Sequence, residues 1–256
     1  MSLKNKRIIV TGGCTGIGAV FTRYLISQGA FVIPTSRKDY GITSFLKTLT
    51  DQEKKKCRPE ILLFDNENNI DQFIDKLKGN YESIYALINN AVGRCTQKYP
   101  EQITIEDLRK EYEVNVFATT YLTIQAIERL IEENGSVVNI SSFYSEVVPD
   151  NRVYNKDMQP TGVGYASSKA SINYITKYLA AYYAYKNIRV NAILPGGVVN
   201  PERQTDYFVK EYVKRTPMNR MANKNEFNEA LYFLLSDKNL YCTGQFITID
   251  GGWSIW

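Results

Sequence analysis

A tyrosine and a lysine four residues apart, Tyr165 and Lys169, are the side chains best suited to chemistry in this chain. On a helix, residues four apart lie on one face, one turn from each other. A phenol is a poor proton donor or acceptor at neutral pH, and a fixed ammonium beside it favours the phenolate. The pair therefore predicts a proton-transfer group, although the same spacing is also typical of a solvated surface pair.

The absence of histidine narrows the chemistry. None of the 256 residues is a histidine, which excludes a Ser-His-Asp triad, a Cys-His pair and the usual histidine-based metal sites. Proton transfer must then fall to tyrosine, lysine, a carboxylate or water. The cysteines have no CxxC spacing, so we expect no metal site and free thiols in a reducing cytosol at Cys14, Cys57, Cys95 and Cys242.

Composition and charge exclude several classes of protein. The hydrophobic content is 44%, the charged content is 23%, and the net charge is +4 without a basic run interleaved with aromatics. We therefore expect no nucleic-acid partner. No apolar stretch approaches a membrane span, and residues 4–7 lead straight into a predicted strand, so we expect a cytoplasmic protein without membrane contact. No linker or repeat divides residues 1–256, which favours one domain.

Apolar runs of strand length alternate with longer amphipathic segments. We expect strands at residues 7–10, 31–33, 61–64, 84–89, 137–141, 188–194 and 246–249. We expect helices at 17–28, 42–55, 69–78, 104–133, 165–186 and 223–236, with Thr104 and Asp107 resembling a helix cap and Gly135 a stop. This alternation predicts an α/β protein: a single-domain, Rossmann-type, doubly wound parallel sheet of about seven strands with helices on both faces.

The loop after the first strand predicts a nucleotide site, because ligands of such sheets bind at the carboxyl ends of the strands. Residues 11–18 read Thr-Gly-Gly-Cys-Thr-Gly-Ile-Gly and precede a predicted helix. Glycines allow a pyrophosphate to approach the backbone, and the helix start offers unpaired N–H groups. The spacing differs from the common GxGxxG. We expect contacts with the nucleotide from Gly12, Cys14, Thr15, Gly16, Ile17 and Gly18.

The end of the second strand indicates which nucleotide. A carboxylate here would hold both ribose hydroxyls of NAD, whereas Ser36, Arg37 and Lys38 offer a hydroxyl and two cations. Cations suit the 2′-phosphate of NADP, so NADP(H) is preferred over NAD(H). A solvated basic loop is the alternative, and the neutral Thr15 supplies no further cation.

Polar or turn-forming residues also follow the later strands. Asp65 and Asn66 are placed to receive an adenine edge, and residues 89–93 form a turn that could meet the cofactor through Asn90 and Ala91. Asn115 lies in a predicted helix, where asparagine is a poor helix former. It is either an ordinary satisfied side chain or a polar group turned into the site. The fifth and sixth strands deliver Ser141, Ser142, Pro195, Gly196, Gly197 and Val198.

In their order and placement, these motifs resemble the short-chain dehydrogenase/reductase family along essentially the whole chain. The matching segments are residues 11–18, Asp65, 89–91, Asn115, 139–142, 165–169, 189–197 and 243–252. The resemblance implies that Tyr165 is the catalytic acid/base and that Lys169 binds the nicotinamide ribose and favours the phenolate. It implies that Ser142 holds the substrate oxygen, that Asn115 anchors a water linked to Lys169, and that Val198 meets the nicotinamide carboxamide. The same resemblance places the cofactor against Asn90, Ala91, Pro195 and Gly196, and the substrate against Ser142, Tyr144, Tyr165 and Gly197.

Three departures from the family pattern concern the site. Val92 stands where the family has glycine, with Gly93 one place late, and Asn200 stands where a threonine often touches the carboxamide. Ser142 and Tyr165 are 23 positions apart, longer than the usual interval. Residues 145–162 therefore look like an insertion at the site mouth, which either contacts a polar substrate or is a loop without such a role.

The predicted reaction is hydride transfer between NADP(H) and a carbonyl or secondary alcohol. Residues 200–221 are expected to be a mobile lid, and an inward-facing cation there would suit an anionic substrate. The insertion and the ending Asp250-Gly251-Gly252-Trp253 are similar to a branch of the family found in bacterial surface-sugar pathways, which implies a sugar or nucleotide-sugar substrate. The alternatives are a reductase of 3-oxoacyl-(acyl-carrier-protein) thioesters and a non-catalytic NADP-sensing protein.

The resemblance also implies a homo-oligomer, a tetramer or dimer, built through the helices that contain Asn115 and Tyr165 and through the C-terminal region. The apolar ending of residues 253–256 suits a subunit interface or folding back on its own chain.

Overall fold

The computed structural model describes residues 3–93 and 97–256, so Cys95 lies outside the described residues. Its centre is a seven-stranded sheet in the order β3-β2-β1-β4-β5-β6-β7, with every pair of neighbours parallel. The strands are β1 Arg7–Val10, β2 Phe31–Ser36, β3 Glu60–Ile61, β4 Ile84–Asn89, β5 Ile131–Ile140, β6 Arg189–Pro195 and β7 Phe246–Ile249. The order reverses between β1 and β4, where a doubly wound sheet binds its ligand. The predicted α/β fold is confirmed.

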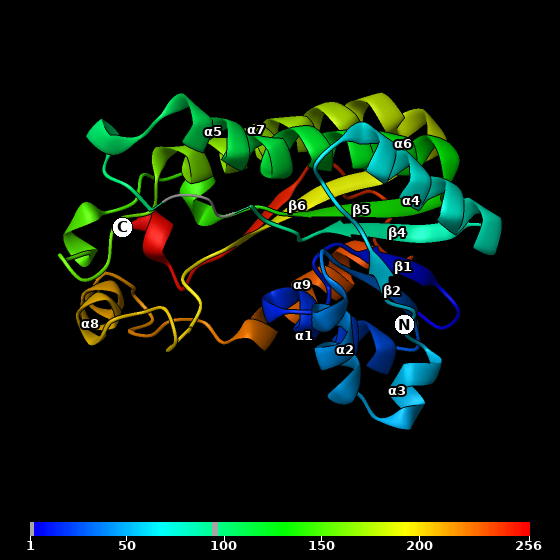
Figure 1. Cartoon of the computed structure of the whole chain (residues 1–256), viewed down its shortest axis with the longest axis horizontal. Coiled ribbons are helices and arrows are strands. Elements are labelled where there is room, and N and C mark those ends of the chain that lie inside the picture. The colour runs from blue at the N-terminus through cyan, green and yellow to red at the C-terminus, as the bar shows by residue number, and fades with distance from the viewer. Residues whose placement is uncertain (1–2, 94–96) are drawn as a thin grey trace.

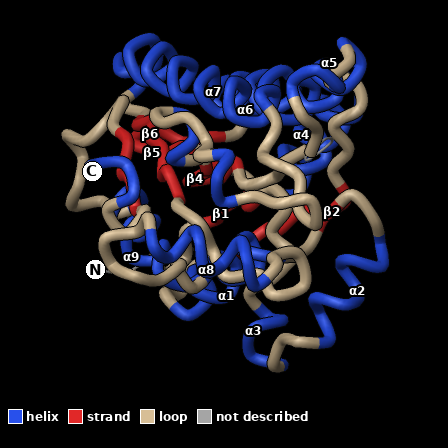
Figure 2. Tube along the Cα trace, turned by 90° about the vertical axis from the view of Figure 1, so that its left-hand side faces the viewer, coloured by secondary structure: helices blue, strands red, loops and turns tan. Residues whose placement is uncertain are grey.

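Helices cover both faces of this sheet (Figure 1). One layer holds α4 Glu67–Asn80, α5 Ile105–Tyr112, α6 Thr119–Arg129 and α7 Val163–Tyr182. The other holds α1 Gly16–Ser27, α2 Asp39–Lys47, α3 Asp51–Lys55 and α9 Asn228–Leu235, and the view in Figure 2 shows the strands between the two layers. No helix in the described part of the chain is both long and apolar enough to cross a membrane.

Alternating strand residues feed two separate apolar cores. Ile8 and Val10 pack with Phe21 and Leu25 of α1, whereas Ile9 between them packs in the core under α4, α6 and α7. Successive strand side chains point to opposite faces, and a strand covered on both faces is apolar throughout. This explains why the strands read as unbroken apolar runs.

The helix expected at residues 42–55 is two helices, α2 and α3. Thr50 begins the second one: its hydroxyl accepts a hydrogen bond from the Glu53 N–H (3.3 Å), and the Glu53 carboxylate accepts one from the Thr50 N–H (2.7 Å). This reciprocal capping box starts a new helix where the apolar periodicity suggested a continuous one. The expected strand at 61–64 is also shorter, because only Glu60–Ile61 pairs with β2.

The helix expected at residues 104–133 ends early and is not uniform. It begins at the predicted Thr104–Asp107 capping box, but α5 gives way to a π-helical turn, Glu113–Ala118, before α6. Directly after α6 the Ile84 N–H donates to Leu130 O (2.9 Å) and Ile131 pairs with Ile84. The chain therefore enters β5 at Ile131, and the prediction that Gly135 stops a helix is wrong, since Gly135 lies within the strand.

The last two predicted helices differ at their ends. The helix carrying Tyr165 starts at Val163 and becomes a 3₁₀ turn after Tyr182. The final helix starts as a 3₁₀ turn, Lys224–Phe227, before α9. A further helix, α8 Asp206–Lys214, lies in the segment expected to be a lid.

Buried amides and hydroxyls join the sheet to the layer of α6 and α7. Asn89 and Asn139 are partners across β4 and β5, and Asn89 Nδ2 donates to Asn139 Oδ1 (2.8 Å) and Thr123 Oγ1 (2.7 Å). Asn139 Nδ2 in turn donates to Thr176 Oγ1 (2.8 Å) on α7. Buried polar groups are costly unless bonded, so this ladder restricts where both helices can sit over the strands.

The carboxyl end of α9 is capped from the sheet. Arg189 is only 2% exposed, and its guanidinium donates to Leu234 O, which also accepts a hydrogen bond from Ser136 Oγ (3.1 Å). The Tyr85 hydroxyl donates to Leu235 O. The last carbonyls of a helix have no partner within the helix, and a cation is favourable there. A buried arginine at the start of β6 therefore caps a carbonyl at the end of α9 from outside that helix.

We expect Arg189→Met to lower the free energy of unfolding by about 1–3 kcal/mol, because it removes the charged donor from the Leu234 carbonyl and leaves only the Ser136 hydroxyl bonded to it. Arg203→Met is the matched control; that arginine is exposed, and its loss should cost less than about 0.5 kcal/mol. Urea unfolding of both variants measures the difference, and equal stabilities of the two would contradict the capping role.

Candidate active site

The loop between β1 and α1 is a backbone cradle held by Asn90. Gly12 and Gly16 have φ of +63° and +56°, a conformation that favours glycine. A Cβ at Gly18 would overlap with the carbonyl oxygen of Gly12, and Asn90 Nδ2 donates to the carbonyls of Thr11 (2.9 Å) and Gly12 (3.3 Å). Cys14 is buried, Thr15 is exposed, and Ile17 lies half-buried in the first turn of α1. The loop thus presents backbone and the start of α1 at the carboxyl end of β1.

Thr11 was missed as a site residue. Its hydroxyl accepts hydrogen bonds from the N–H groups of both Asn90 and Ala91 (2.9 Å each) and so joins the ends of β1 and β4. The signal that could have revealed it is its position, directly after a strand and at the start of the glycine loop. It fixes the distance between the glycine loop and the residue 89–91 turn, both of which were predicted to meet the cofactor.

Asn115 lies in the π-helical turn, 2% exposed, and binds the turn after β4. Its Oδ1 accepts from Gly93 N–H (2.8 Å), and its Nδ2 donates to Gly93 O (3.2 Å) and Ser168 Oγ (3.1 Å). Gly93 packs against Val114. The glycine that stands one position late is therefore the residue whose N–H and carbonyl both bond to the Asn115 amide. Both alternatives for Asn115 are partly met. Its side chain is bonded to protein groups, and the π-helical turn also directs it toward α7 through Ser168. The predicted water at Asn115 stays a prediction.

Ser142, Tyr165 and Lys169 lie around the place where the end of β5 contacts α7. The Lys169 side chain is 5% exposed, and its Nζ donates to Ile140 O (2.7 Å) and lies 5.9 Å from the centroid of the Tyr165 ring. Ser141 Oγ donates to Lys169 O (3.1 Å), a second link between the strand and the helix. The Ser142 hydroxyl accepts from the Tyr144 N–H (3.2 Å), and within residues 3–93 and 97–256 its own proton has no acceptor. The arrangement offers an O–H donor, a half-buried phenol and an ammonium at one strand end.

The loop after β6 is tied to its neighbours. Gly196 N–H donates to Ile249 O (2.8 Å), and Ala222 N–H donates to Gly197 O (2.9 Å). Gln204 Nε2 donates to Val198 O (2.8 Å), and its Oε1 accepts from Asn200 N–H (2.7 Å). Pro195 is buried as the last residue of β6. These bonds keep residues 195–200 at the same sheet edge as the glycine loop.

A third apolar core covers the site mouth. Phe208 and Tyr212 of α8 pack with Phe143, Val153, Tyr154, Met221 and Trp253. The Tyr212 hydroxyl accepts from Gly197 N–H (2.6 Å), and its ring stacks on Trp253 with centroids 4.3 Å apart. Burial raises the pKa of Tyr212 and, with Tyr154 beside it, raises the pKa of Tyr144 well above its usual value, so both stay neutral hydroxyls. The segment expected to be a mobile lid is thus packed on the insertion and on the chain end.

The charged residues of the mouth form ion pairs with one another or lie at the surface. Asp150 of the insertion pairs with Arg152 and Arg215 (2.9 and 2.8 Å), and the hydrogen bond from Arg152 is the main cause that lowers the pKa of Asp150 to about 2. Arg220 pairs with Glu226, and Lys214 pairs with Glu211. Arg203, Lys210, Asn155 and Lys156 are exposed or half-buried at the surface. The hypothesis of an inward-facing cation therefore has no support among the cations of residues 200–221.

Part of the apolar ending folds back on its own chain. Trp253 is 9% exposed within the third core, and the Trp256 indole donates to Arg215 O (2.8 Å). Ile255 and Trp256 remain exposed.

A family model described as enoyl-(acyl carrier protein) reductase matches residues 12–254. The 3-oxoacyl-(acyl-carrier-protein) reductase FabG of Thermotoga maritima is 31% identical over 255 residues, which cover 98% of this chain and 99% of that protein. The chain belongs to the short-chain dehydrogenase/reductase family. A 3alpha-hydroxysteroid dehydrogenase of Mediterraneibacter gnavus is 30% identical over 257 residues, covering 98% of each chain.

Solved structures agree with this membership. A short-chain dehydrogenase from Leptospira borgpetersenii with bound NAD+ has a TM-score of 0.86 and 29% identity, over 98% of this chain and 94% of that one. The chain is accordingly an NAD(P)-dependent oxidoreductase of this family acting on CH–OH and C=O groups. The glycine loop fits such a cofactor. A Cβ at Gly18 would overlap with the Gly12 carbonyl oxygen, so glycine at this position allows the tight turn that brings the backbone close to a pyrophosphate.

The remaining predicted cofactor residues lie along the same sheet edge. Ser36 is half-buried at the end of β2, and Arg37 is exposed without a hydrogen bond or ion pair to any described residue. Asp65 and Asn66 lie at the start of α4; Asn66 Oδ1 accepts from Asn69 N–H (2.9 Å) and Asp65 accepts from the Asn69 amide. Asn66 is therefore occupied as a helix cap, a role that the sequence reading did not assign to it.

Two further features lie outside the chemistry. Burial raises the pKa of the Cys14 thiol to about 11, so Cys14 in the glycine loop is an inert side chain rather than a nucleophile.

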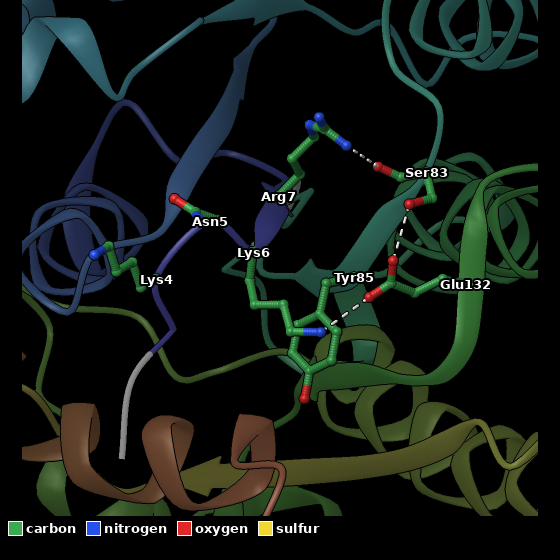
Figure 3. Close-up of a pocket in the computed structure, with 7 residues that line it drawn as sticks. All are labelled: Lys4, Asn5, Lys6, Arg7, Ser83, Tyr85 and Glu132. Carbon is green, nitrogen blue, oxygen red and sulfur yellow. Dashed lines mark hydrogen bonds and ion pairs between the residues drawn. The ribbon is translucent and has the colours of Figure 1, made fainter.

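A pocket of about 280 Å³ lies at the amino ends of the strands, the edge opposite Tyr165 (Figure 3). Its Lys6 already pairs with Glu132 (3.1 Å) and covers the Tyr85 ring. Metal-ligating side chains form no cluster among the described residues.

Proposed function

We propose that this enzyme transfers a hydride between NADP(H) and a carbonyl or secondary alcohol carbon, with Tyr165 as the acid/base. The observation that carries the proposal is that Tyr165, Lys169 and Ser142 lie around the carboxyl end of β5, on the same edge of the sheet as the glycine loop. A bound nicotinamide would supply or accept the hydride. In reduction, Tyr165 protonates the developing alkoxide while the Ser142 hydroxyl donates to the same oxygen. Lys169 stabilises the phenolate that remains.

NADP is the proposed cofactor because of the residues at the end of β2. Arg37 is exposed and has no partner among the described residues, so its guanidinium is available to a 2′-phosphate. Ser36 Oγ donates to Lys38 O (3.0 Å) and accepts from Lys38 N–H (3.3 Å), a local turn that presents the two cations beside the glycine loop. Neither residue offers the carboxylate that would bind both ribose hydroxyls of NAD.

For the substrate we propose an uncharged, hydroxyl-bearing compound such as a sugar derivative. Neutral phenols and aromatic rings form the mouth of the site, and the nearby cations are paired or turned to solvent. This favours a neutral sugar over a sugar phosphate or nucleotide sugar, which would need a free cation. The two similar relatives act by name on an acyl-carrier-protein thioester and on a steroid, so their names do not decide between substrates.

We also propose a homo-oligomer formed through α7 and its neighbours. Ile105, Phe117, Tyr174, Tyr178 and Tyr182 are all more than half exposed. Tyr174, Tyr178 and Tyr182 are four apart and form one stripe on α7, and exposed apolar stripes of this kind are typical of interfaces. A dimer or tetramer that buries this stripe is the proposed assembly.

Cys14, Cys57 and Cys242 are free thiols, in keeping with a cytoplasmic location.

Tyr165→Phe should lower kcat by at least about 100-fold, because it removes the transferable proton, and leave the Kd for NADPH nearly unchanged. Tyr241→Phe, at a fully exposed tyrosine outside α7, is the control and should keep full activity. Steady-state kinetics and NADPH fluorescence titration measure the two quantities. Substantial turnover by Tyr165→Phe would exclude Tyr165 as the acid/base. Tight NADP binding by a wild-type protein that turns over no carbonyl or alcohol would favour the non-catalytic sensor.

Arg37→Ala should raise the KM for NADPH by about 10-fold or more and barely change the KM for NADH, since a charge-assisted contact to the 2′-phosphate is lost. Arg58→Ala, which removes an exposed arginine before β3, is the control for the change in net charge. A parallel shift with both cofactors, or no shift, would contradict the proposed preference for NADP.

A substrate panel separates the sugar proposal from the acyl-thioester alternative. We expect NADPH oxidation with neutral keto-sugars, and much slower oxidation with acetoacetyl thioesters and keto-sugar phosphates. Faster turnover of acetoacetyl thioesters would make the chain a 3-oxoacyl-(acyl-carrier-protein) reductase instead.

A further inference from the structure

The face of α7 that carries Tyr165 and Lys169 continues with a third polar residue, Asn173. The three residues are four apart, so they lie along one side of the helix. Asn173 is 7% exposed, and burying a polar side chain is costly unless it is bonded. Its hydrogen bonds therefore show what the amide does two turns beyond Tyr165.

The Asn173 amide is bonded through its nitrogen only. Nδ2 donates to Ser145 Oγ (2.7 Å), whereas Oδ1 is buried and has no hydrogen-bond partner within residues 3–93 and 97–256. An unbonded buried carbonyl oxygen costs at least as much free energy as one neutral hydrogen bond contributes. An apolar side chain of the same branched shape should therefore hold the fold about as well. What the amide contributes is the contact with Ser145 rather than net stability.

Ser145 passes this contact on to Ser142. The Ser145 hydroxyl donates to Ser142 O, and the Ser145 N–H donates to the same oxygen (2.9 Å). Ser142 begins the 3₁₀ turn Phe143–Ser145, and its own hydroxyl accepts from the Tyr144 N–H (3.2 Å). The Asn173 amide, the Ser145 hydroxyl and the Ser142 carbonyl thus form a hydrogen-bond relay in which the donors run in one direction.

The relay means that α7 holds the segment around Ser142 from both sides. Before Ser142, the Ser141 hydroxyl donates to Lys169 O (3.1 Å), and after it, the Ser145 hydroxyl accepts from Asn173. Lys169 and Asn173 are one turn apart, so a single face of the helix makes both contacts. Loss of the Asn173 bond would release the far end of the turn and leave the near end in place.

We propose that Asn173 is a positioning residue that acts through Ser145 to fix the turn of Ser142 and the direction of the Ser142 hydroxyl. Its effect on turnover rests on the proposed function, in which that hydroxyl donates to the substrate oxygen, whereas its hold on the turn does not. Without the amide, the Ser145 hydroxyl loses its donor and the turn can shift relative to α7. A small misplacement of a catalytic group lowers turnover strongly.

The test breaks the relay at each of its two links. Asn173→Leu keeps the branched shape and removes the donor, whereas Ser145→Ala removes the hydroxyl and Ser145→Thr keeps it. We expect Asn173→Leu and Ser145→Ala each to lower kcat by about 10-fold, with the KM for NADPH within about 2-fold and the urea midpoint nearly unchanged. Ser145→Thr should keep most of the activity. Asn80→Leu, at an exposed asparagine at the end of α4, is the matched control and should change none of these quantities.

A Ser142→Ala background decides whether Asn173 acts through Ser142. Adding Asn173→Leu there should lower kcat by less than about 2-fold, because the hydroxyl that it positions is already gone. A further loss of about 10-fold in this background would assign Asn173 a general structural role and overturn the proposal.

Amide hydrogen exchange in the NADPH-bound full chain reads the turn without any substrate. Exchange of residues 144–147 should accelerate in Asn173→Leu and Ser145→Ala, and stay unchanged in Asn80→Leu. Unchanged exchange or unchanged kcat in the two variants that break the relay would contradict the positioning role. If Asn173→Leu does not fold, Ser145→Ala supplies every readout, including the one in the Ser142→Ala background. A wild-type chain inactive on every carbonyl and alcohol would overturn the proposed function, and the exchange of residues 144–147 would then decide the hold on the turn by itself.

Discussion

The buried ammonium of Lys169 needs hydrogen-bond acceptors, and this requirement fixes where α7 lies on the sheet. A charge taken out of water at 5% exposure is strongly unfavourable unless it is bonded, and its described acceptor is the carbonyl of Ile140, 2.7 Å away. That carbonyl is the last of β5, so α7 has to cross the strand at its carboxyl end. The return bond from Ser141 Oγ to Lys169 O fixes the helix in the same place. Ser142, one residue further along, is thereby brought to the same strand end as the helix that carries Tyr165.

This position of α7 is supported along its whole length by polar contacts buried between the layers. Thr176 is held by Asn139 of β5, Ser168 by Asn115 of the π-helical turn, and the helix start lies against Glu111. The same face of the sheet holds α6 through Asn89 and Thr123. Because each of these groups would be costly if left unbonded, sliding α7 along β5 would break several bonds at once. The placement of α7 on the sheet therefore depends on these contacts as well as on its apolar packing.

Local patterns in the sequence predicted the elements of this scaffold, and long-range contacts decided what the patterns missed. The glycine loop, the Thr104 capping box and the Tyr165–Lys169 spacing each lie within a few consecutive residues, and the parallel sheet followed from the alternation of strands and helices. Gly135 looked like a helix stop because nothing in its neighbourhood shows that Ile131 pairs with Ile84, almost 50 positions earlier. The burial of Glu111 has no signal in its neighbouring residues, because the carboxylate packs against a glycine in another helix. The sequence shows that Gly93 stands one position later than the family glycine. It does not show the reason, which is the pair of hydrogen bonds between Gly93 and the Asn115 amide.

The mouth of the site is held together by aromatic packing, whereas α7 is held on the sheet by buried hydrogen bonds. Its ion pairs are partly exposed, with side chains of Asp150 and Arg215 at 18% and 25% exposure, and such pairs contribute only about 0–1 kcal/mol each. Burial of an aromatic side chain such as Phe208 or Tyr212 contributes about 1.5–3 kcal/mol, so the third core rather than the charges holds α8 on the insertion. This core meets the scaffold at Phe143 and at the Tyr212–Gly197 hydrogen bond. Changes in residues 145–162 and 206–214 can therefore alter the shape of the mouth while the contacts that hold α7 on β5 stay intact, and this separation supports the proposal that the substrate is selected at the aromatic core.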